Sequence, residues 1–152
     1  MSSDEIEDIA GNGYSGFQDG FAFYSMFFVP SAIAVNWNYP YGDVLYITDS
    51  YNNCIRSINT SISFVETFAG NCSASGGYAD GPLLNSSFLV PSSAKLLSTN
   101  INNLIVADTG NNKIRVIHID KGLNRKRREK KQTNKIQSKS KQTKAKQNKP
   151  KQ

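Results

Sequence analysis

The sequence is short of the residues that build most catalytic and metal sites. Its 152 residues contain two cysteines and one histidine. The histidine, His118, has no second His and no Cys at metal-ligand spacing, so we expect a packed or edge histidine rather than a ligand. No catalytic constellation is visible either. The sequence therefore predicts a protein without a metal or cofactor, and it predicts no enzyme activity within this chain.

Long apolar runs are also missing. The longest, residues 21–35, spans about 15 residues and is interrupted by Pro30, whereas a membrane-spanning helix needs about 20. The acidic start, SSDEIED, carries no basic segment followed by an apolar run, so no signal peptide is expected there. These two absences leave the compartment undecided.

Charge divides the chain into two parts. Residues 1–120 hold 4 Lys and Arg against 11 Asp and Glu, a net of −7, whereas residues 121–152 hold 14 against one, a net of +13. The second part has no aromatic residue, and its apolar side chains are Leu123, Ile136 and Ala145. Such a composition buries too little surface to offset the entropy of ordering, which predicts a disordered basic tail.

The first part repeats itself at an interval of about 60 residues. IEDIAGN at residues 6–12 matches VETFAGN at 65–71, and GFQDG at 16–20 matches GYADG at 77–81. FFVPS at 27–31 matches FLVPS at 88–92, and LYITDSYNNCIRSI at 45–58 matches LIVADTGNNKIRVI at 104–117. A period of this length is typical of stacked repeats, in which each copy forms one supersecondary unit.

One triplet in the second copy, Asp108-Thr109-Gly110, resembles the catalytic triplet of aspartic proteases. Those enzymes need two such triplets facing each other. The first copy has Asp49-Ser50-Tyr51 at the same place, and the tyrosine breaks the triplet. We therefore interpret the triplet as a turn.

The two copies share a hairpin instead. A β-rich run (VLYIT or NLIVA) leads to Asp, then to a short Ser, Thr, Gly and Asn segment, then to a second β-rich run (CIRSI or KIRVI). The Asp side chain can accept bonds from loop N–H groups, and Asn tolerates positive φ in the turn. The residues assigned to this structural turn are Asp49, Asn52, Asn53, Arg56, Asp108, Asn111, Asn112 and Arg115.

The ordered pattern AGN, G(F/Y)xDG, F(L/F)VPS, L(Y/I)(I/V)xD and NNxIRxI resembles NHL repeats, which are the four-stranded blades of a β-propeller. The match runs over about residues 6–118. The resemblance implies an all-β fold, a partial β-propeller of about two antiparallel blades in residues 1–120, followed by the tail at 121–152.

Strands can be placed on the copies. The full blade covers residues 31–69, with strands at 31–36, 44–48, 54–59 and 64–69. The next blade, at 92–119, supplies strands at 92–97, 103–107 and 113–119. Residues 6–10 are expected to be the last strand of a preceding blade. A ring closes with about four to eight blades, so we expect a fragment of a longer protein or a shortened gene product.

The two cysteines lie at the ends of neighbouring predicted strands. Cys54 opens the third strand of the full blade and Cys72 follows the fourth, so a cross-strand disulfide is expected. Three sequons, at Asn59, Asn71 and Asn85, lie in predicted turns. Together with the cysteine pair they favour an exported parent protein.

The resemblance implies a recognition scaffold, because such propellers hold proteins, and in some members RNA or glycans, with the loops at one rim. Aromatic residues that can act as loop contacts, or can cover the end of the blade, cluster in WNYPYGD: Trp37, Tyr39 and Tyr41. We expect a non-catalytic module that binds a protein or glycan partner. One alternative is part of a propeller enzyme that is similar to the lyases or strictosidine-synthase-like relatives.

A second alternative is nucleic-acid binding through the tail, since its basic run can contact phosphates. No aromatic residue is interleaved there for base stacking. The residues that would make these contacts are Arg125, Lys126, Arg127, Arg128, Lys130 and Lys131. A third reading of the tail is translated A-rich sequence beyond the true exon end.

Overall fold

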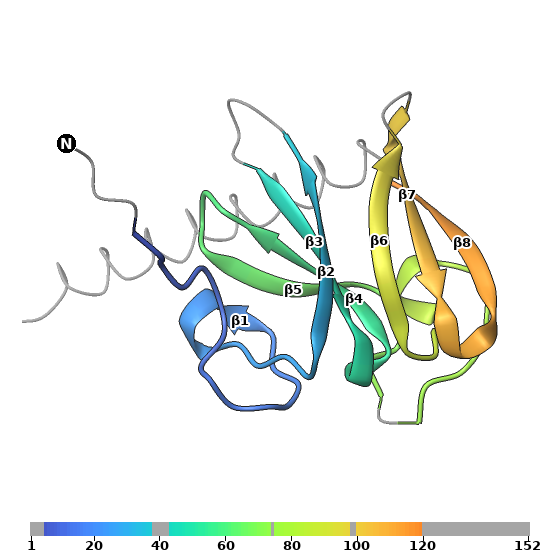
Figure 1. The fold of residues 1–152 in the computed structure, drawn as a ribbon, viewed down its shortest axis with the longest axis horizontal. Helices are drawn as coiled ribbons and strands as arrows, with labels where there is room; N and C mark the ends of the chain where they lie inside the picture. The colour runs from blue at the N-terminus through green and yellow to red at the C-terminus, as the bar shows by residue number, and fades with distance from the viewer. Residues whose placement is uncertain (1–4, 38–42, 74, 98–99, 120–152) are drawn as a thin grey trace, which may run out of the picture. The chain divides into compact units, whose positions relative to one another are not determined.

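The protein was analysed as a computed structural model, which describes residues 5–37, 43–73, 75–97 and 100–119 (Figure 1). The described strands belong to one compact unit, Met1–His118. All of them pair antiparallel and the described residues form no α-helix, so the predicted all-β class is confirmed.

The first sheet has five strands in the order β1-β5-β4-β3-β2. Its strands are β1 (Gly20–Phe21), β2 (Pro30–Asn36), β3 (Val44–Asp49), β4 (Cys54–Asn59) and β5 (Phe64–Ala69). A short 3-10 helix, η1 (Ala22–Tyr24), follows β1, and η2 (Ser50–Asn52) joins β3 to β4. β2 to β5 form the four-stranded blade expected at residues 31–69.

The second sheet has the order β6-β7-β8. It consists of β6 (Pro91–Leu97), β7 (Asn100–Asp108) and β8 (Lys113–His118), with η3 (Leu83–Asn85) before it and η4 (Thr109–Asn111) between β7 and β8. β6 lies against β2 and β3 of the first sheet, so the two sheets are packed as neighbouring blades (Figure 1).

The prediction of a strand at residues 6–10 is wrong for this structure. The segment forms no strand, and Ile6 is fully exposed. The matching residues of the second copy do form a strand, β5, because β4 lies beside them and accepts their backbone hydrogen bonds. No described strand stands in that place for residues 6–10, so the backbone has no ladder to join.

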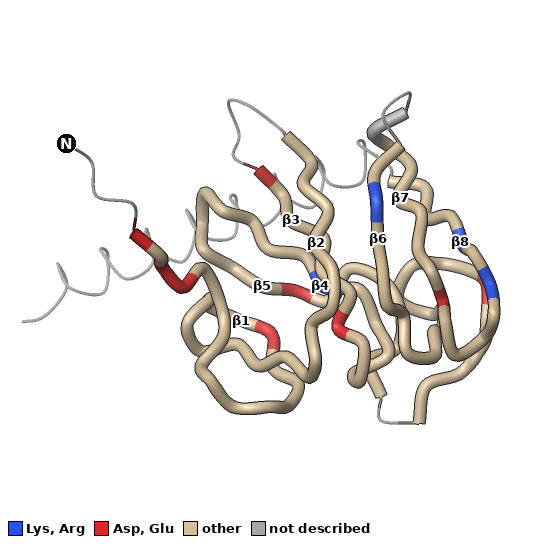
Figure 2. The backbone as a smooth tube through the Cα atoms, in the orientation of Figure 1, with Lys and Arg blue, Asp and Glu red and all other residues tan. Residues whose placement is uncertain are grey.

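Apolar side chains of the first sheet alternate between two buried faces, as expected for a blade covered on both sides. On one face Ile47, Ile58 and Val65 form a core cluster with Ala22 of η1. On the other face Tyr46 and Ile55 are buried. Charged residues are sparse on both sheets, and the N-terminal segment is acidic (Figure 2).

Polar contacts join the two blades at the start of β6. Ser50 Oγ donates to the carbonyl of Pro91 at 2.5 Å, and Ser31 Oγ donates to the carbonyl of Ser92 at 3.0 Å. The N–H of Val90 donates to Asn53 Oδ1 at 2.8 Å. These bonds fix how the second blade meets the first.

Candidate functional site

The end of β3 is organised around the carboxylate of Asp49. This side chain is fully buried, and its Oδ1 accepts the N–H of Phe28 at 2.7 Å. Its Oδ2 accepts the amide of Asn52 at 2.9 Å, and the same amide donates to the carbonyl of Gly16 at 2.8 Å. The carboxylate thus ties the β3–β4 turn to the segment that precedes β2.

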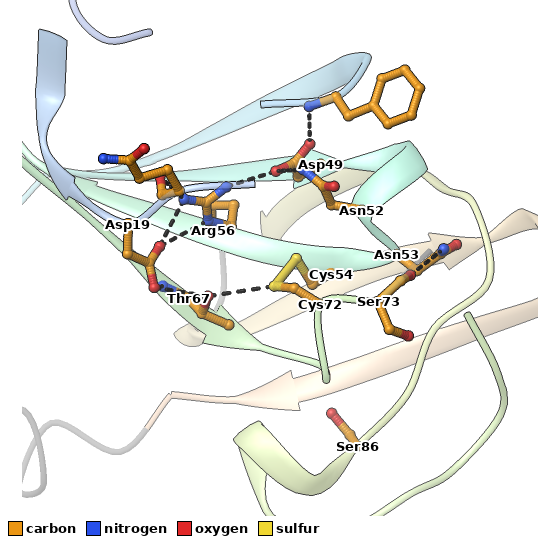
Figure 3. Close-up of a disulfide and its surroundings, with 12 residues drawn as sticks. Asp19, Asp49, Asn52, Asn53, Cys54, Arg56, Thr67, Cys72, Ser73 and Ser86 are labelled. Atoms are coloured by element: carbon orange, nitrogen blue, oxygen red, sulfur yellow. Dashed lines mark hydrogen bonds and ion pairs between the residues drawn. A yellow bond between two sulfur atoms is a disulfide. The ribbon is translucent and has the colours of Figure 1, made fainter. Parts of the chain in front are cut away.

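The guanidinium of Arg56, on β4, lies beside this carboxylate and has no exposed side-chain surface. It bonds Asp49 Oδ2 at 2.7 Å and Asp19 Oδ1 at 2.7 and 3.1 Å (Figure 3). It also donates to the carbonyls of Met26 (3.0 Å) and Gln18 (2.8 Å). Two carboxylates and two carbonyls therefore satisfy one buried cation, which is the condition for burying a charge without a large penalty.

Asp19 is a partner that the hairpin analysis did not assign. It comes from the GFQDG motif, and its second oxygen accepts both the N–H and the hydroxyl of Thr67 on β5, each at 3.0 Å. Two aromatic rings lie against the guanidinium: Phe17 at 4.8 Å and Phe27 at 5.0 Å from ring centroid to Cζ. The motifs of one copy thus meet in a single network, which we call the Asp–Arg clamp.

The second blade builds the same clamp about 60 residues later. Arg115 bonds Asp108 Oδ2 at 2.9 Å and Asp80 Oδ1 at 2.7 Å. Asn111 donates to Asp108 Oδ2 at 2.9 Å, and the N–H of Leu89 donates to Asp108 Oδ1 at 2.8 Å. Asp108 is fully buried. Three donors of the fold therefore bond the two oxygens of the carboxylate that could serve a protease.

The two clamps differ in exposure. Arg115 is 10% exposed and its partner Asp80 is 73% exposed, whereas Arg56 is fully buried. The rings around Arg115 are Tyr78 at 5.2 Å and Phe88 at 4.5 Å. The second clamp is thus closer to a surface ion pair, which contributes little to stability. Breaking the buried first clamp costs more, because it leaves a buried charge without its partner.

The exposed clamp predicts a dependence of stability on pH. The hydroxyl of Tyr78, which donates to Asp80 at 3.0 Å, and then the guanidinium of Arg115 hold the pKa of Asp80 below its usual value of 3.8. A carboxylate whose pKa is lower in the folded chain than in the unfolded chain stabilises the fold at pH values above its unfolded-state pKa. This contribution is lost as the pH falls through the pKa of the folded state. Asp80→Asn should therefore lower the free energy of unfolding at neutral pH. The difference from the wild type should shrink as pH falls below 3.8, as measured by urea unfolding; a difference that stays constant down to acid pH would contradict this.

The asparagines predicted to lie in the turns have two different structural roles. Asn52 and Asn111 hold the carboxylates, whereas Asn53 and Asn112 adopt left-handed backbone with φ of 56° and 54°. Asn53 also faces the next blade, where its Oδ1 accepts from Val90 and its Nδ2 donates to the carbonyl of Ser73 at 2.8 Å. Arg56 and Arg115 lie in the strands after the turn rather than in it.

The two cysteines form a disulfide. Cys54 and Cys72 are joined across 18 residues of sequence, with their Cα atoms 5.0 Å apart (Figure 3). Cys54 is fully buried at the start of β4. The bond holds the segment after β5 against the strand that carries Arg56.

The remaining candidate residues are dispersed. Trp37, the residue after β2, is 76% exposed. Tyr39 and Tyr41 lie outside the described residues, and so does the basic run at 125–131. His118 is exposed on β8, where its Nδ1 lies 2.9 Å from Asn103 Oδ1. Within the described ranges, no group of three or more His, Cys, Asp or Glu residues could hold a metal ion.

A pair of exposed aromatic rings was missed by the sequence analysis. Phe28 (40% exposed) and Tyr51 (50% exposed) meet edge to face, with ring centroids 5.2 Å apart. Val29, between Phe28 and β2, is 49% exposed and has a φ of 56°, which is rare for a β-branched residue. We call these three residues the rim patch.

Comparison with known proteins gives likeness over part of the chain. No model of a known protein family matches it. The Arabidopsis thaliana protein SUPPRESSOR OF QUENCHING 1, chloroplastic, is 38% identical over 78 residues, which are 51% of this chain and 7% of that protein.

Two solved structures from Bacteroides thetaiotaomicron VPI-5482 share the fold. An auxiliary nutrient binding protein has a TM-score of 0.64 at 24% identity, covering 74% of this chain and 28% of that one. A structural genomics protein of unknown function has a TM-score of 0.64 at 21% identity, covering 73% and 26%. The chain thus spans about a quarter of these solved chains. Among the described residues, no helix is long and apolar enough to cross a membrane.

Proposed function

We propose that the chain is part of an NHL-repeat β-propeller and acts as a non-catalytic scaffold, which binds a protein or glycan partner through loops at one end of its blades. The Asp–Arg clamps support the repeat assignment. In both copies the pattern residues of GxxDG, FxVPS and NNxIR contact one another, so the pattern is accounted for by the architecture of a blade. These residues are consequently unavailable for chemistry on a substrate.

The rim patch is the observation that carries the binding proposal. The second blade has the same turn, including the bond from the N–H of residue 110 to the carbonyl of Leu89 (2.8 Å) that matches the bond from Tyr51 to Phe28 (3.0 Å). Yet it places Leu89 and Gly110 where the first blade has Phe28 and Tyr51. The fold therefore does not need the two rings, and a role outside the fold explains their exposure.

Hydrogen bonds also hold the backbone that carries the patch before any partner binds. The N–H of Phe28 is bound by the buried carboxylate of Asp49, and the N–H groups of Ser50 and Tyr51 donate to the carbonyls of Val29 (3.3 Å) and Phe28 (3.0 Å). Rigid aromatic side chains lose little entropy on binding, which makes them frequent anchors at interfaces. Their flat apolar faces fit an apolar protein side chain or the C–H face of a sugar.

The proposal is tested by screening the full chain for binding to a peptide-display library and to a glycan array. Ligands that also bind the isolated peptide 121–152 are discarded, because they bind the basic tail. For the tightest remaining ligand, the double variant Phe28→Ala/Tyr51→Ala should raise the Kd by about 10- to 100-fold. The matched control is Phe23→Ala/Tyr24→Ala, which removes one exposed Phe and one exposed Tyr elsewhere.

Equal losses in the two double variants would show general stickiness and contradict a site at the rim. A third variant, Trp37→Ala, tests the other end of the blade, because Trp37 follows β2 whereas the rim patch precedes it. A loss confined to Trp37→Ala would move the binding site to that loop and overturn the assignment to Phe28 and Tyr51.

A further inference from the structure

Two of the short helices, η1 and η3, occupy matching places in the two copies of the repeat. Each is three residues long, and they begin at Ala22 and Leu83. The carbonyl of Ala22 accepts the N–H of Gly11, and the carbonyl of Leu83 accepts the N–H of Gly70, both at 2.8 Å. The two helices are therefore held in the same way by the AGN motif that precedes each of them.

A buried serine follows each helix. Ser25 is fully buried, and its Oγ donates to the carbonyl of the first residue of η1 at 2.6 Å. Ser86 is 6% exposed and donates to the first residue of η3 in the same way, at 2.8 Å. The residue before the serine is exposed in both copies: Tyr24, at 70%, in η1 and Asn85 in η3. The same local structure thus presents the last residue of each helix to solvent.

This exposure is seen in two different surroundings. η1 follows β1, which pairs with β5 of the complete blade, so Tyr24 is exposed beside a blade with all four strands in place. η3 packs against β5 of the same blade, so Asn85 is exposed where the preceding blade is complete. A side chain as large as tyrosine is accommodated at this position, and a group attached to Asn85 has room to extend into solvent.

Asn85 begins the sequon Asn85-Ser86-Ser87. An Asn-x-Ser sequence is an acceptor for an N-linked oligosaccharide in proteins that enter the secretory pathway. The side chain of Asn85 makes no hydrogen bond with the other described residues, and the same holds for the hydroxyl of Ser87. The two side chains that define the sequon are therefore not needed by the described part of the fold.

The other two sequons are tied into the fold. Asn59 is half-buried, and its Oδ1 accepts the N–H of Ser61 at 3.1 Å. Asn71 is followed by Cys72 of the disulfide, and the N–H of Ser73 donates to a carbonyl of the β3–β4 turn at 3.1 Å. A transferase has to reach these two sequons before the chain folds, whereas the side chain of Asn85 stays accessible afterwards.

We propose that Asn85 carries an N-linked oligosaccharide and is the preferred acceptor among the three sequons. In the transfer, Nδ2 of Asn85 attacks the anomeric carbon of an oligosaccharide carried on a polyprenyl diphosphate. An N–C bond forms, the C–O bond to the diphosphate breaks, the lipid diphosphate leaves with the electron pair, and the amide proton passes to a base. The disulfide between Cys54 and Cys72 supports the proposal, because disulfides persist in the oxidising compartments through which glycosylated proteins pass.

The occupancy of each sequon can be measured on the protein isolated from its own cells. Peptide N-glycosidase in heavy-oxygen water converts each glycosylated Asn to a labelled Asp, which mass spectrometry of the peptides detects. The labelled fraction should be highest at Asn85. An unlabelled Asn85, or a larger labelled fraction at Asn59 or Asn71, would overturn the proposal.

Variants of the full chain, secreted from a eukaryotic host behind a signal peptide, provide a second test. Ser87→Ala should lose the gel shift of one glycan, whereas Ser87→Thr, which keeps a hydroxyl, should retain it. The matched control is Ser73→Ala in the sequon of Asn71, which should leave the gel shift unchanged. After enzymatic removal of the glycan, Ser87→Ala should unfold at the wild-type temperature, because the Ser87 hydroxyl makes no hydrogen bond with the other described residues.

A Ser87→Ala chain with the full wild-type gel shift would contradict the proposal, and so would an equal loss in Ser73→Ala. Both tests measure a covalent modification and not binding, so their outcome is independent of the rim patch and of the function proposed for it.

Discussion

Arg56→Ala should lower the free energy of unfolding by about 3–5 kcal/mol, because it leaves the buried carboxylate of Asp49 without its cation. Asp49 and Arg56 both have no exposed side-chain surface and lie 2.7 Å apart. Removing one partner of such a pair leaves a buried charge with no opposite charge beside it. The loss includes the bonds to the carbonyls of Gln18 and Met26, which hold the preceding segment. Urea unfolding followed by tryptophan or tyrosine fluorescence measures the difference.

The matched control is Arg115→Ala in the second clamp. Arg115 makes the same contacts, but it is 10% exposed and Asp80 is 73% exposed, so water can reach the charges left behind. Its loss should be smaller than that of Arg56→Ala by at least about 1 kcal/mol. Equal losses in the two variants would show that burial does not determine how much the clamp stabilises the fold. A loss near zero in Arg56→Ala would show that the first clamp does not stabilise the fold.

Removal of the disulfide is the second large effect. The double variant Cys54→Ala/Cys72→Ala should lose about 3 kcal/mol, the value that the chain-entropy model gives for a closed loop spanning the observed separation of 18 residues. The loss arises in the unfolded chain, which gains the freedom that the bond had removed. Lys113 occupies the place of Cys54 in the second blade, so the blade itself folds without a cysteine there.

Reduction of the wild type provides a second measurement of the same quantity. The urea midpoint of the wild type under strong reductant should match that of the double variant, and reductant should leave the variant unchanged. A double variant as stable as the oxidised wild type would show that the bond adds nothing to the stability of the fold.

The strands were predictable because each is a short run with its own β-rich signal and turn residues at both ends. β4 and β5 have the predicted bounds, and β2 and β6 begin one residue earlier, at Pro30 and Pro91. The segment at residues 6–10 shows the limit of this reasoning. Its sequence is that of a strand, but a strand also needs a neighbour, and the pattern within the segment carries no information about one.

The clamp was only half predictable for a related reason. Asp49, Asn52 and Arg56 are close in sequence, and their repetition marked them as a unit. Asp19 was visible as part of a repeated motif, but its bond to Arg56 spans 37 residues and exists only once β1 pairs with β5. The sequence did hold a signal for this bond: the Asp of GxxDG and the Arg of NNxIR both repeat at the same interval of about 60 residues.

The rim patch could not be predicted because it departs from the repeat. Repetition directs attention to positions that agree, whereas Phe28 and Tyr51 are positions where the copies differ. Their exposure and their contact became visible only in the folded blade. Differences between copies are therefore the better guide to binding, and agreements are the better guide to architecture.

The central claim is that the repeated motifs form a structural clamp within each blade. A double-mutant cycle on Asp49 and Arg56, using Asp49→Ala, Arg56→Met and the double variant in urea unfolding, tests it most directly. The clamp predicts a coupling energy of about 1–3 kcal/mol. The double variant should lose less free energy of unfolding than the two single variants lose in total. Additive losses, with a coupling energy within about 0.3 kcal/mol of zero, would contradict the claim.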